Sequence, residues 1–358
     1  MMLNKYLFIL SSKYILINTF LISILIIFIN ILEISRIIEA RDNELNQLAL
    51  LSLLKLPSIV SEIIPFVIII SIAFLFKNLI SNNELISMRN VGFSILDIFK
   101  PIGLSILLFG FVILVFLNPL SAKFEKKFNE ITNKNKSDIY SIKVIENGMW
   151  IKNVANNNQL NYINISEINL NTMYANNIKI FQVSEDSNKV IISKKGKIDN
   201  KKFVLYNVTI ENLDNNTKQK KGKIILDLNF EKENIINSIS NYKHIPYYKY
   251  IEHINSLKKF NLYAPEIALF YLSEICKPFF LLIIGFVVMG FSGKFKRNEN
   301  FFKILFVAVL IGFLIFLFKE IMITITSKFS INYIISYLII LIIPTIFGFY
   351  QTVKIEND

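Results

Sequence analysis

The chain has 358 residues, of which 53% are hydrophobic, a mean hydropathy of +0.48 and a formal net charge of +12. A soluble domain cannot bury that share of apolar side chains, so the composition indicates a protein embedded in a lipid bilayer. The positive charge would suit anionic lipid or nucleic acid. Because Ile, Asn and Lys are abundant along the whole chain, as in proteins of AT-rich genomes, the total charge identifies neither partner, and we expect no nucleic-acid ligand.

Six apolar stretches are long enough to cross a bilayer, which takes about 20 residues of helix. They are residues 13–34, 56–78, 98–118, 265–291, 301–323 and 331–351. The first stretch follows Lys5 and Lys13 and has no small-residue cleavage site after it, so we interpret it as an uncleaved helix and not as a signal peptide. The pattern predicts an α-helical membrane protein with six transmembrane helices, three on each side of a large polar insert.

The basic residues of the short loops predict the orientation, because such loops keep Lys and Arg in the cytoplasm. With the N-terminus inside, the cytoplasmic segments hold Lys5, Lys13, Lys77, Arg89, Lys100, Lys294, Lys296, Arg297, Lys303 and Lys354. The opposite short loops hold only Arg36, Arg41, Lys55 and Lys328. We therefore expect a multi-pass protein of the inner membrane with both termini in the cytoplasm and the insert in the periplasm.

The insert consists of short runs rich in Ile, Val, Tyr and Phe, most of them alternating with polar residues. They are residues 148–153, 159–168, 177–185, 188–198, 201–213 and 222–230. Strands at this spacing predict an all-β sandwich, jelly roll or barrel. The inward side chains are predicted to be Trp150, Phe181, Ile191, Phe203 and Tyr206. Residues 246–262 have the pattern of an amphipathic helix that leads into the fourth span.

Motifs for catalysis are missing from the sequence. It has no P-loop, GxSxG, HExxH, CxxC pair or Gly-rich dinucleotide loop. The two histidines, His244 and His253, have no cysteine near them, and Cys276 is the single cysteine, so a zinc site is not expected. We predict a protein that is not an enzyme and carries no catalytic residue, metal or cofactor; a separate chain would bind and hydrolyse ATP.

Residues 79–97 form a short polar segment between the second and third spans. In a helix, one face would carry Leu79, Leu85, Ile86, Met88 and Val91, with Glu84 and Arg89 projecting elsewhere. Asn82 or Asn83 is the predicted N-cap, and Gly92 the predicted helix end. Such a helix either joins two spans at the membrane surface or, as in ABC-type permeases, transmits a push from a soluble ATPase. The residues alone leave both interpretations open.

This segment resembles the coupling helix of the lipopolysaccharide-export permeases LptF and LptG, whose pattern runs E-L-x-x-M-x-x-x-G-x-S/T, here Glu84–Ser94. The resemblance covers nearly the whole chain, including the 3+3 spans and the periplasmic β-jellyroll. Pro57 and Pro65 in LPSIVSEIIPF, Asn118-Pro119-Leu120 after the third span, and SEICKPF (273–279) in the fourth span also resemble the family. GMWIK (148–152) is more similar to the opening strand of LptG than to LptF, so LptG is favoured.

The resemblance implies domains at 1–120 (spans one to three with the coupling helix at about 79–97), 121–245 (the jelly roll) and 246–358 (the connecting helix and spans four to six). It implies that Glu84, Leu85, Met88, Arg89 and Gly92 couple the permease to an LptB-like ATPase dimer. It also implies an LptF-like permease as heterodimer partner, LptC- and LptA-like jellyroll proteins, and lateral gates at Tyr14–Ile34 and Phe301–Ile323.

Lipopolysaccharide, the implied substrate, needs a cavity with an apolar wall and a cationic rim, and charges within spans are functional candidates by default. The predicted cavity residues are Glu33, Arg36, Lys55, Glu62, Glu274, Lys277, Lys319 and Glu320. Glu274 and Lys277 are three positions apart, so a structural ion pair is an equal alternative for them. Lys319 and Glu320 point in different directions along a helix. Some members of the family carry a lysine near the end of the first span, where this sequence reads Asn30-Ile31-Leu32-Glu33, and Glu33 and Arg36 resemble the acidic and basic positions that follow it. In the fourth span, the charge before the proline is partly acidic, with Glu274 and with Lys277 next to Pro278.

Two other classes of protein remain possible from the sequence. A membrane-anchored sensor or scaffold with an exported β domain would normally continue into a cytoplasmic output domain, whereas this sequence ends at Asp358. An integral membrane enzyme acting on envelope lipids would need clustered acids, histidines or metal ligands, and no such cluster is apparent. The sequence therefore favours a transporter subunit.

Overall fold

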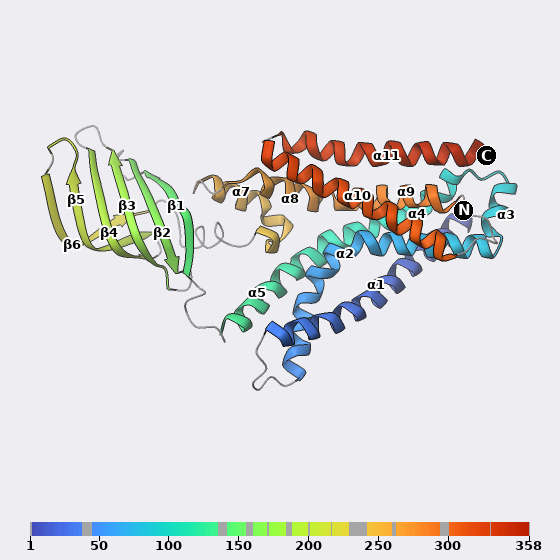
Figure 1. Ribbon diagram of the computed structural model, residues 1–358, viewed down its shortest axis with the longest axis horizontal. Coiled ribbons are helices and arrows are strands. Elements are labelled where there is room, and N and C mark those ends of the chain that lie inside the picture. The colour runs from blue at the N-terminus through green and yellow to red at the C-terminus, as the bar shows by residue number, and fades with distance from the viewer. Residues whose placement is uncertain are drawn as a thin grey trace. The chain divides into compact units, whose positions relative to one another are not determined.

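The computed structural model divides into two compact units, one helical and one built mainly of strands (Figure 1). The helical unit contains Met1–Phe128, His244–Tyr247 and Pro265–Asp358, and the β unit contains Asn129–Lys243 and Tyr248–Ala264. The structure describes residues 2–37, 45–134, 142–154, 160–169, 172–183, 188–199, 201–215, 217–228, 242–259, 263–293, 301–329 and 331–357. The loop cations Arg41, Lys294, Lys296 and Arg297 lie outside these residues, as do parts of the predicted strands 159–168, 177–185 and 222–230 and of the predicted helix 246–262.

Among its described residues, the helical unit has five helices that are long and apolar enough to cross a membrane, and six if one bent pair counts as a span. In chain order the elements are α1 (Met2–Ile37), α2 (Leu45–Ser81), α3 (Glu84–Asn90), α4 (Ile95–Val112), the π-helical η1 (Ile113–Leu117), α5 (Asn118–Lys134), α8 (Pro265–Ile275), α9 (Lys277–Ser292), α10 (Phe301–Phe329) and α11 (Tyr333–Asn357). The prediction of six apolar spans around an insert is confirmed, with the fourth span made of α8 and α9 at an angle of 64°.

Helix α9 is the most enclosed element of the helical unit, and it packs against α2, α4, α10 and α11. Small residues allow these close contacts. A Cβ added to Gly110 of α4 would lie 2.7 Å from the backbone of Pro278 in α9, and one added to Gly285 would lie 2.5 Å from Ile106. In contrast, α1 and α10 expose many large apolar side chains, among them Phe20, Phe28, Phe306 and Phe313. These faces suit lipid or another apolar chain.

Two irregularities in the spans follow from prolines, which cannot donate a backbone hydrogen bond. Pro278 stands in the first turn of α9, so the N–H that would have bonded to the carbonyl of Glu274 is missing and the fourth span bends at Cys276. Pro119 follows the π-helical turn η1, which widens the helix before the proline. Helix α2 runs unbroken through both Pro57 and Pro65, which leaves the carbonyl of Ser61 without its partner four residues on.

In the part of the β unit that the structure describes, six strands form an antiparallel sheet in sequence order, so each strand pairs with its neighbours along the chain (Figure 1). The strands are β1 (Ile142–Val154), β2 (Leu160–Asn169), β3 (Tyr174–Val183), β4 (Asn188–Asp199), β5 (Lys202–Asn212) and β6 (Thr217–Asp227). The inserted β domain is thus confirmed, with the strand order of a meander. Asn153 of β1 donates from Nδ2 to the backbone oxygen of Asp227 at 2.8 Å, which links the first strand to the end of the last.

The prediction of inward side chains in the sheet was right for two residues and wrong for three. Ile191 and Phe203 are buried in the core of the sheet. Trp150, Phe181 and Tyr206 are 38%, 37% and 36% exposed and lie on the other face, where Trp150 and Phe181 stack with ring centroids 6.0 Å apart. Successive residues of a strand point to opposite faces, so burying their neighbours Met149, Ile180 and Leu205 turns these three outward.

The segment after the sheet was predicted to be one helix over 246–262. In the structure it consists of two short 3₁₀ turns, η3 (Tyr242–His244) and η4 (Tyr247–Lys249), followed by α7 (Tyr250–Lys259). His253 and Leu257 are buried on one side of α7, while Ile251 is exposed. Helix α7 belongs to the β unit and not to the helical unit.

Candidate functional site

Helix α3 lies between α2 and α4, with a hydrogen-bonded turn at each of its ends. It ends in a Schellman motif, in which Phe93 N–H donates to Met88 O at 3.1 Å and Gly92 N–H to Arg89 O at 2.9 Å. Gly92 has a φ of +95°, as this motif requires. Ser94 then caps α4, with its Oγ accepting from Asp97 N–H at 3.0 Å. Asn83 holds the N-cap position of α3 with a φ of 59°, but its side chain makes no capping bond.

The apolar residues of α3 divide between the bundle core and the surface. Leu85 and Met88 are buried in the core of the helical unit, so they anchor α3 to its own chain and are not exposed to a partner. The coupling role that the family resemblance implies for Leu85 and Met88 stays a prediction. Ile86, Val91 and Phe93 are 49%, 76% and 38% exposed, and sequence reasoning did not assign them a contact role.

The two charged residues of α3 are bonded to the first and last helices of the chain. Glu84, which is half-buried, accepts a hydrogen bond at Oε2 from the hydroxyl of Tyr6 in α1, at 2.8 Å. Arg89 donates from Nη2 to the backbone oxygen of Ile355 in α11, at 3.1 Å. The start of α1, the end of α11 and α3 therefore lie at the same end of the helical unit (Figure 1).

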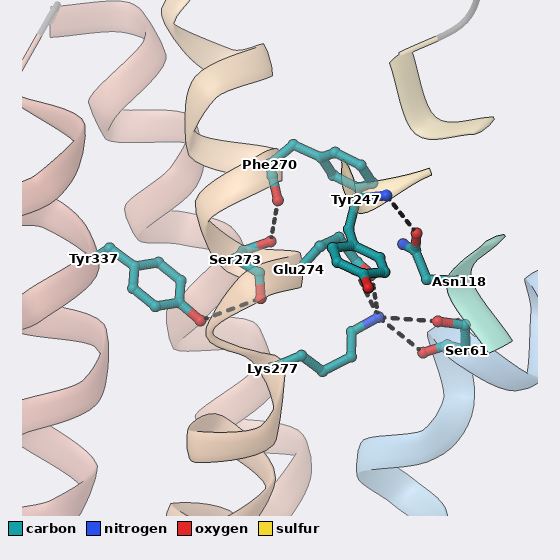
Figure 2. Close-up of polar contacts among 8 residues, drawn as sticks. All are labelled: Ser61, Asn118, Tyr247, Phe270, Ser273, Glu274, Lys277 and Tyr337. Carbon is teal, nitrogen blue, oxygen red and sulfur yellow. Dashed lines mark hydrogen bonds and ion pairs between the residues drawn. The ribbon is translucent and has the colours of Figure 1, made fainter. Parts of the chain in front are cut away.

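A cluster of polar side chains lies at the bend of the fourth span, where Lys277 joins α9 to α8 and α2 (Figure 2). Its Nζ lies 2.6 Å from Glu274 Oε1 and donates to Ser61 Oγ at 3.0 Å and to the Ser61 backbone oxygen at 3.3 Å. That oxygen is the one left without a partner by Pro65, so the lysine satisfies it. Sequence reasoning found Glu274 and Lys277 but missed Ser61, which is 216 positions away.

Further polar contacts surround this bend. Ser273 Oγ donates to the backbone oxygen of Phe270 at 2.8 Å, and the hydroxyl of Tyr337 in α11 donates to the backbone oxygen of Ser273 at 3.5 Å (Figure 2). On the other side, Asn118 Oδ1 accepts from the backbone N–H of Tyr247 at 2.9 Å. Asn118, from the polar exit after the third span, thus fixes the chain where it returns to the helical unit.

The remaining predicted cavity residues do not lie together. Glu33 and Lys55 form a loose pair between α1 and α2, with 3.9 Å between Nζ and Oε1. The side chains of Arg36 and Glu62 are exposed. Lys319 Nζ lies 5.3 Å from the ring centroid of Phe280 in α9.

Glu320 instead faces an open depression along α10, between Leu317 and Thr324. The structure thus brings Lys277 and Glu274 together, places Lys319 against the same helix α9, and leaves Arg36 and Glu62 exposed.

Among the residues that the structure describes, there is no group of three His, Cys, Asp or Glu side chains that could hold a metal ion. His244 Nε2 lies 3.7 Å from Glu125 Oε1, a pair that joins η3 to α5. The arrangement of α3 is suited to mechanical contact, and that of Lys277 to holding helices together.

A comparison with protein families supplies the identity of the chain. Residues 5–354 match the model described as lipopolysaccharide export system permease LptF/LptG. A comparison with curated proteins found no match. The family model does not distinguish LptF from LptG. Since the match covers both the helical unit and the inserted sheet, the chain belongs to the LptF/LptG family of lipopolysaccharide export permeases.

Proposed function

We propose that this chain is one of the two permease subunits of an ATP-driven transporter that extracts lipopolysaccharide from the inner membrane. Of the two family types, the opening strand with Trp150 favours LptG, with an LptF-like chain as partner. The two permeases pair with an LptB-like ATPase dimer on the cytoplasmic side. In the periplasm, LptC- and LptA-like jellyroll proteins extend the β unit towards the outer membrane.

The observation that carries the proposal is the construction of α3. A helix of seven residues is anchored by two buried side chains, closed by a Schellman motif and fixed at both charged positions to other helices. A simple connector between two spans needs none of these features. A push against the exposed Ile86, Val91 and Phe93 would instead reach α1 and α11 without being absorbed by a flexible loop.

We propose that charged residues of the spans contact the substrate, with different roles for Lys277 and for the cations Lys319 and Arg36. Lys277 is neutralised by Glu274 and held by Ser61, which suits it to shaping the wall of a cavity. Lys319 on α10 and Arg36 at the end of α1 are the cations proposed to meet the lipid phosphates. Both lie on the helices that would form the lateral gates, which puts them where a headgroup would pass.

The experiment that tests the proposal is affinity purification in mild detergent, followed by identification of companion chains and bound lipid. The wild type is expected to bring down an ATPase, a second permease and lipopolysaccharide. Glu84→Ala is expected to weaken ATPase association by about 2 kcal/mol or more, about thirtyfold in affinity, because a partner cation would be left unpaired. Glu266→Ala, an exposed glutamate in the first turn of α8, serves as the matched control. An undiminished amount of ATPase with Glu84→Ala would refute the coupling role.

The orientation is tested separately with single-cysteine variants in a Cys276→Ala background. A membrane-impermeant thiol reagent added to the periplasmic side is expected to label Trp150→Cys and to leave Glu84→Cys unlabelled. Labelling of both positions from the same side would place α3 with the β unit and rule out contact with a cytoplasmic motor.

A further inference from the structure

The hydroxyl of Tyr6 connects α1 directly to the carboxylate of α3. Tyr6 is in the second turn of α1 and its neighbour Leu7 is fully buried in the core, so the position of the tyrosine is fixed by packing. The bond to Glu84 Oε2 is 2.8 Å long and joins residues that are 78 positions apart. Although Tyr6 is 43% exposed, its ring is thus held beside α3 by its own helix.

Beyond this bond, α1 contacts the bundle through buried apolar side chains such as Leu7 and Ile15, and through two polar contacts. Ser11 Oγ lies 2.6 Å from Ser105 Oγ of α4, and Asn18 donates to Ser71 Oγ of α2 at 3.1 Å. The opposite side of α1 is apolar and exposed. Hydrogen bonds between membrane helices are individually modest, so a displacement at the first turns of α1 can shift the helix as a unit.

We propose that Tyr6 is the positioning residue for Glu84, and that it transmits the movement of α3 to α1. The inference rests on the proposed function, since it assigns a role within the same coupling site. A carboxylate has two oxygens, so a bond at Oε2 leaves Oε1 able to accept from a cation of the ATPase. One glutamate then links the motor, α3 and the first helix in series.

With this role of Tyr6, docking of the ATPase and transmission of its movement to α1 can be changed separately. Removing the hydroxyl of Tyr6 leaves the charge of Glu84 and the exposed apolar residues of α3 in place, so the ATPase still docks. The movement of α3 no longer reaches α1 through the carboxylate. Replacing Glu84 by Gln has the opposite effect, because the amide oxygen still accepts from Tyr6 while the charge that attracts the ATPase is lost.

The test compares Tyr6→Phe and Glu84→Gln in the full complex, purified with its companion chains and reconstituted with lipopolysaccharide. For Tyr6→Phe, the co-purified ATPase is expected to stay within about twofold of wild type. Its lipopolysaccharide release per ATP hydrolysed is expected to fall about three- to tenfold, the range for one charge-assisted hydrogen bond at a partly exposed site. Glu84→Gln is expected to lose ATPase at purification. Tyr350→Phe, at an exposed tyrosine of α11, is the matched control and should resemble wild type.

The outcomes separate the inference from the function on which it rests. If Glu84→Gln loses the ATPase but Tyr6→Phe releases lipid as efficiently as wild type, the role of Tyr6 is refuted and the coupling site stands. If Tyr6→Phe loses the ATPase to the same extent as Glu84→Gln, Tyr6 acts in docking and the transmission role is refuted. If neither variant changes ATPase association or transport, the proposed coupling site itself is wrong.

Discussion

Replacing Lys277 by Met is expected to destabilise the helical unit, because the Glu274 carboxylate loses its ion-pair partner and the Ser61 backbone oxygen loses its hydrogen-bond donor. The side chains of Lys277 and Glu274 are only 10% and 12% exposed. Removing one member of a buried ion pair costs about 3–5 kcal/mol, because the other charge stays buried without compensation. The Ser61 backbone oxygen, which Pro65 leaves without a helical partner, also loses its donor.

Two second-site changes are expected to recover part of this loss. Glu274→Gln combined with Lys277→Met removes both charges, so the double variant should be more stable than Lys277→Met alone by about 1–2 kcal/mol. Pro65→Ala returns a backbone N–H to the carbonyl of Ser61. In that background Lys277→Met should cost about 1 kcal/mol less than in the wild type.

The assay is thermal or denaturant unfolding in detergent micelles, with Lys303→Met as the control at an exposed lysine of α10. The control is expected to unfold like the wild type. If Lys277→Met also does so, the lysine is not a structural tie. If the double variant with Glu274→Gln is as unstable as Lys277→Met alone, the uncompensated carboxylate is not the source of the cost.

Two further predictions concern packing and lipid contact. Gly110→Ala places a methyl group 2.7 Å from a backbone carbon of α9 and should lower the free energy of unfolding by about 1–3 kcal/mol. Gly222→Ala, which has open space around it, is the control and should leave the stability unchanged. Equal stability of the two variants would contradict the close approach of α4 and α9. A photo-crosslinking residue at Lys319 or Arg36 should capture lipopolysaccharide during transport, and one at the exposed Phe20 of α1 should capture it less; capture at position 20 alone would reject the cationic rim.

The motif that carries the family resemblance can be explained residue by residue. Leu85 and Met88 anchor α3 in the core, and Gly92 takes the positive φ that ends the helix. Ser94 caps the helix that follows. Only Glu84 has no such internal requirement, since its one bond to Tyr6 lies at the surface. Four positions of the pattern therefore build the helix and its flanking turns, and Glu84 is the position that the proposed function assigns to a partner.

Local sequence determined the elements of this protein because each depends on near neighbours. Runs of about 20 apolar residues specify spans, prolines specify the bend at Cys276, and alternation of apolar and polar residues specifies strands. A strand was not predicted where the alternation of apolar and polar residues is missing. The first half of β6 is Lys-rich and was not predicted, yet its backbone pairs with β5 from Thr217 onward.

The tertiary structure decided which side chains meet and which face each residue takes. The sequence pattern could not show that Trp150 faces outward, because both faces of β1 carry apolar residues and only the register buries Met149. Nor could it pair Lys277 with Ser61 or Tyr6 with Glu84, which are 216 and 78 positions apart. Periodicity reports how a segment folds on itself. Contacts between distant segments form only when packing of the whole bundle fixes the depth and rotation of each helix.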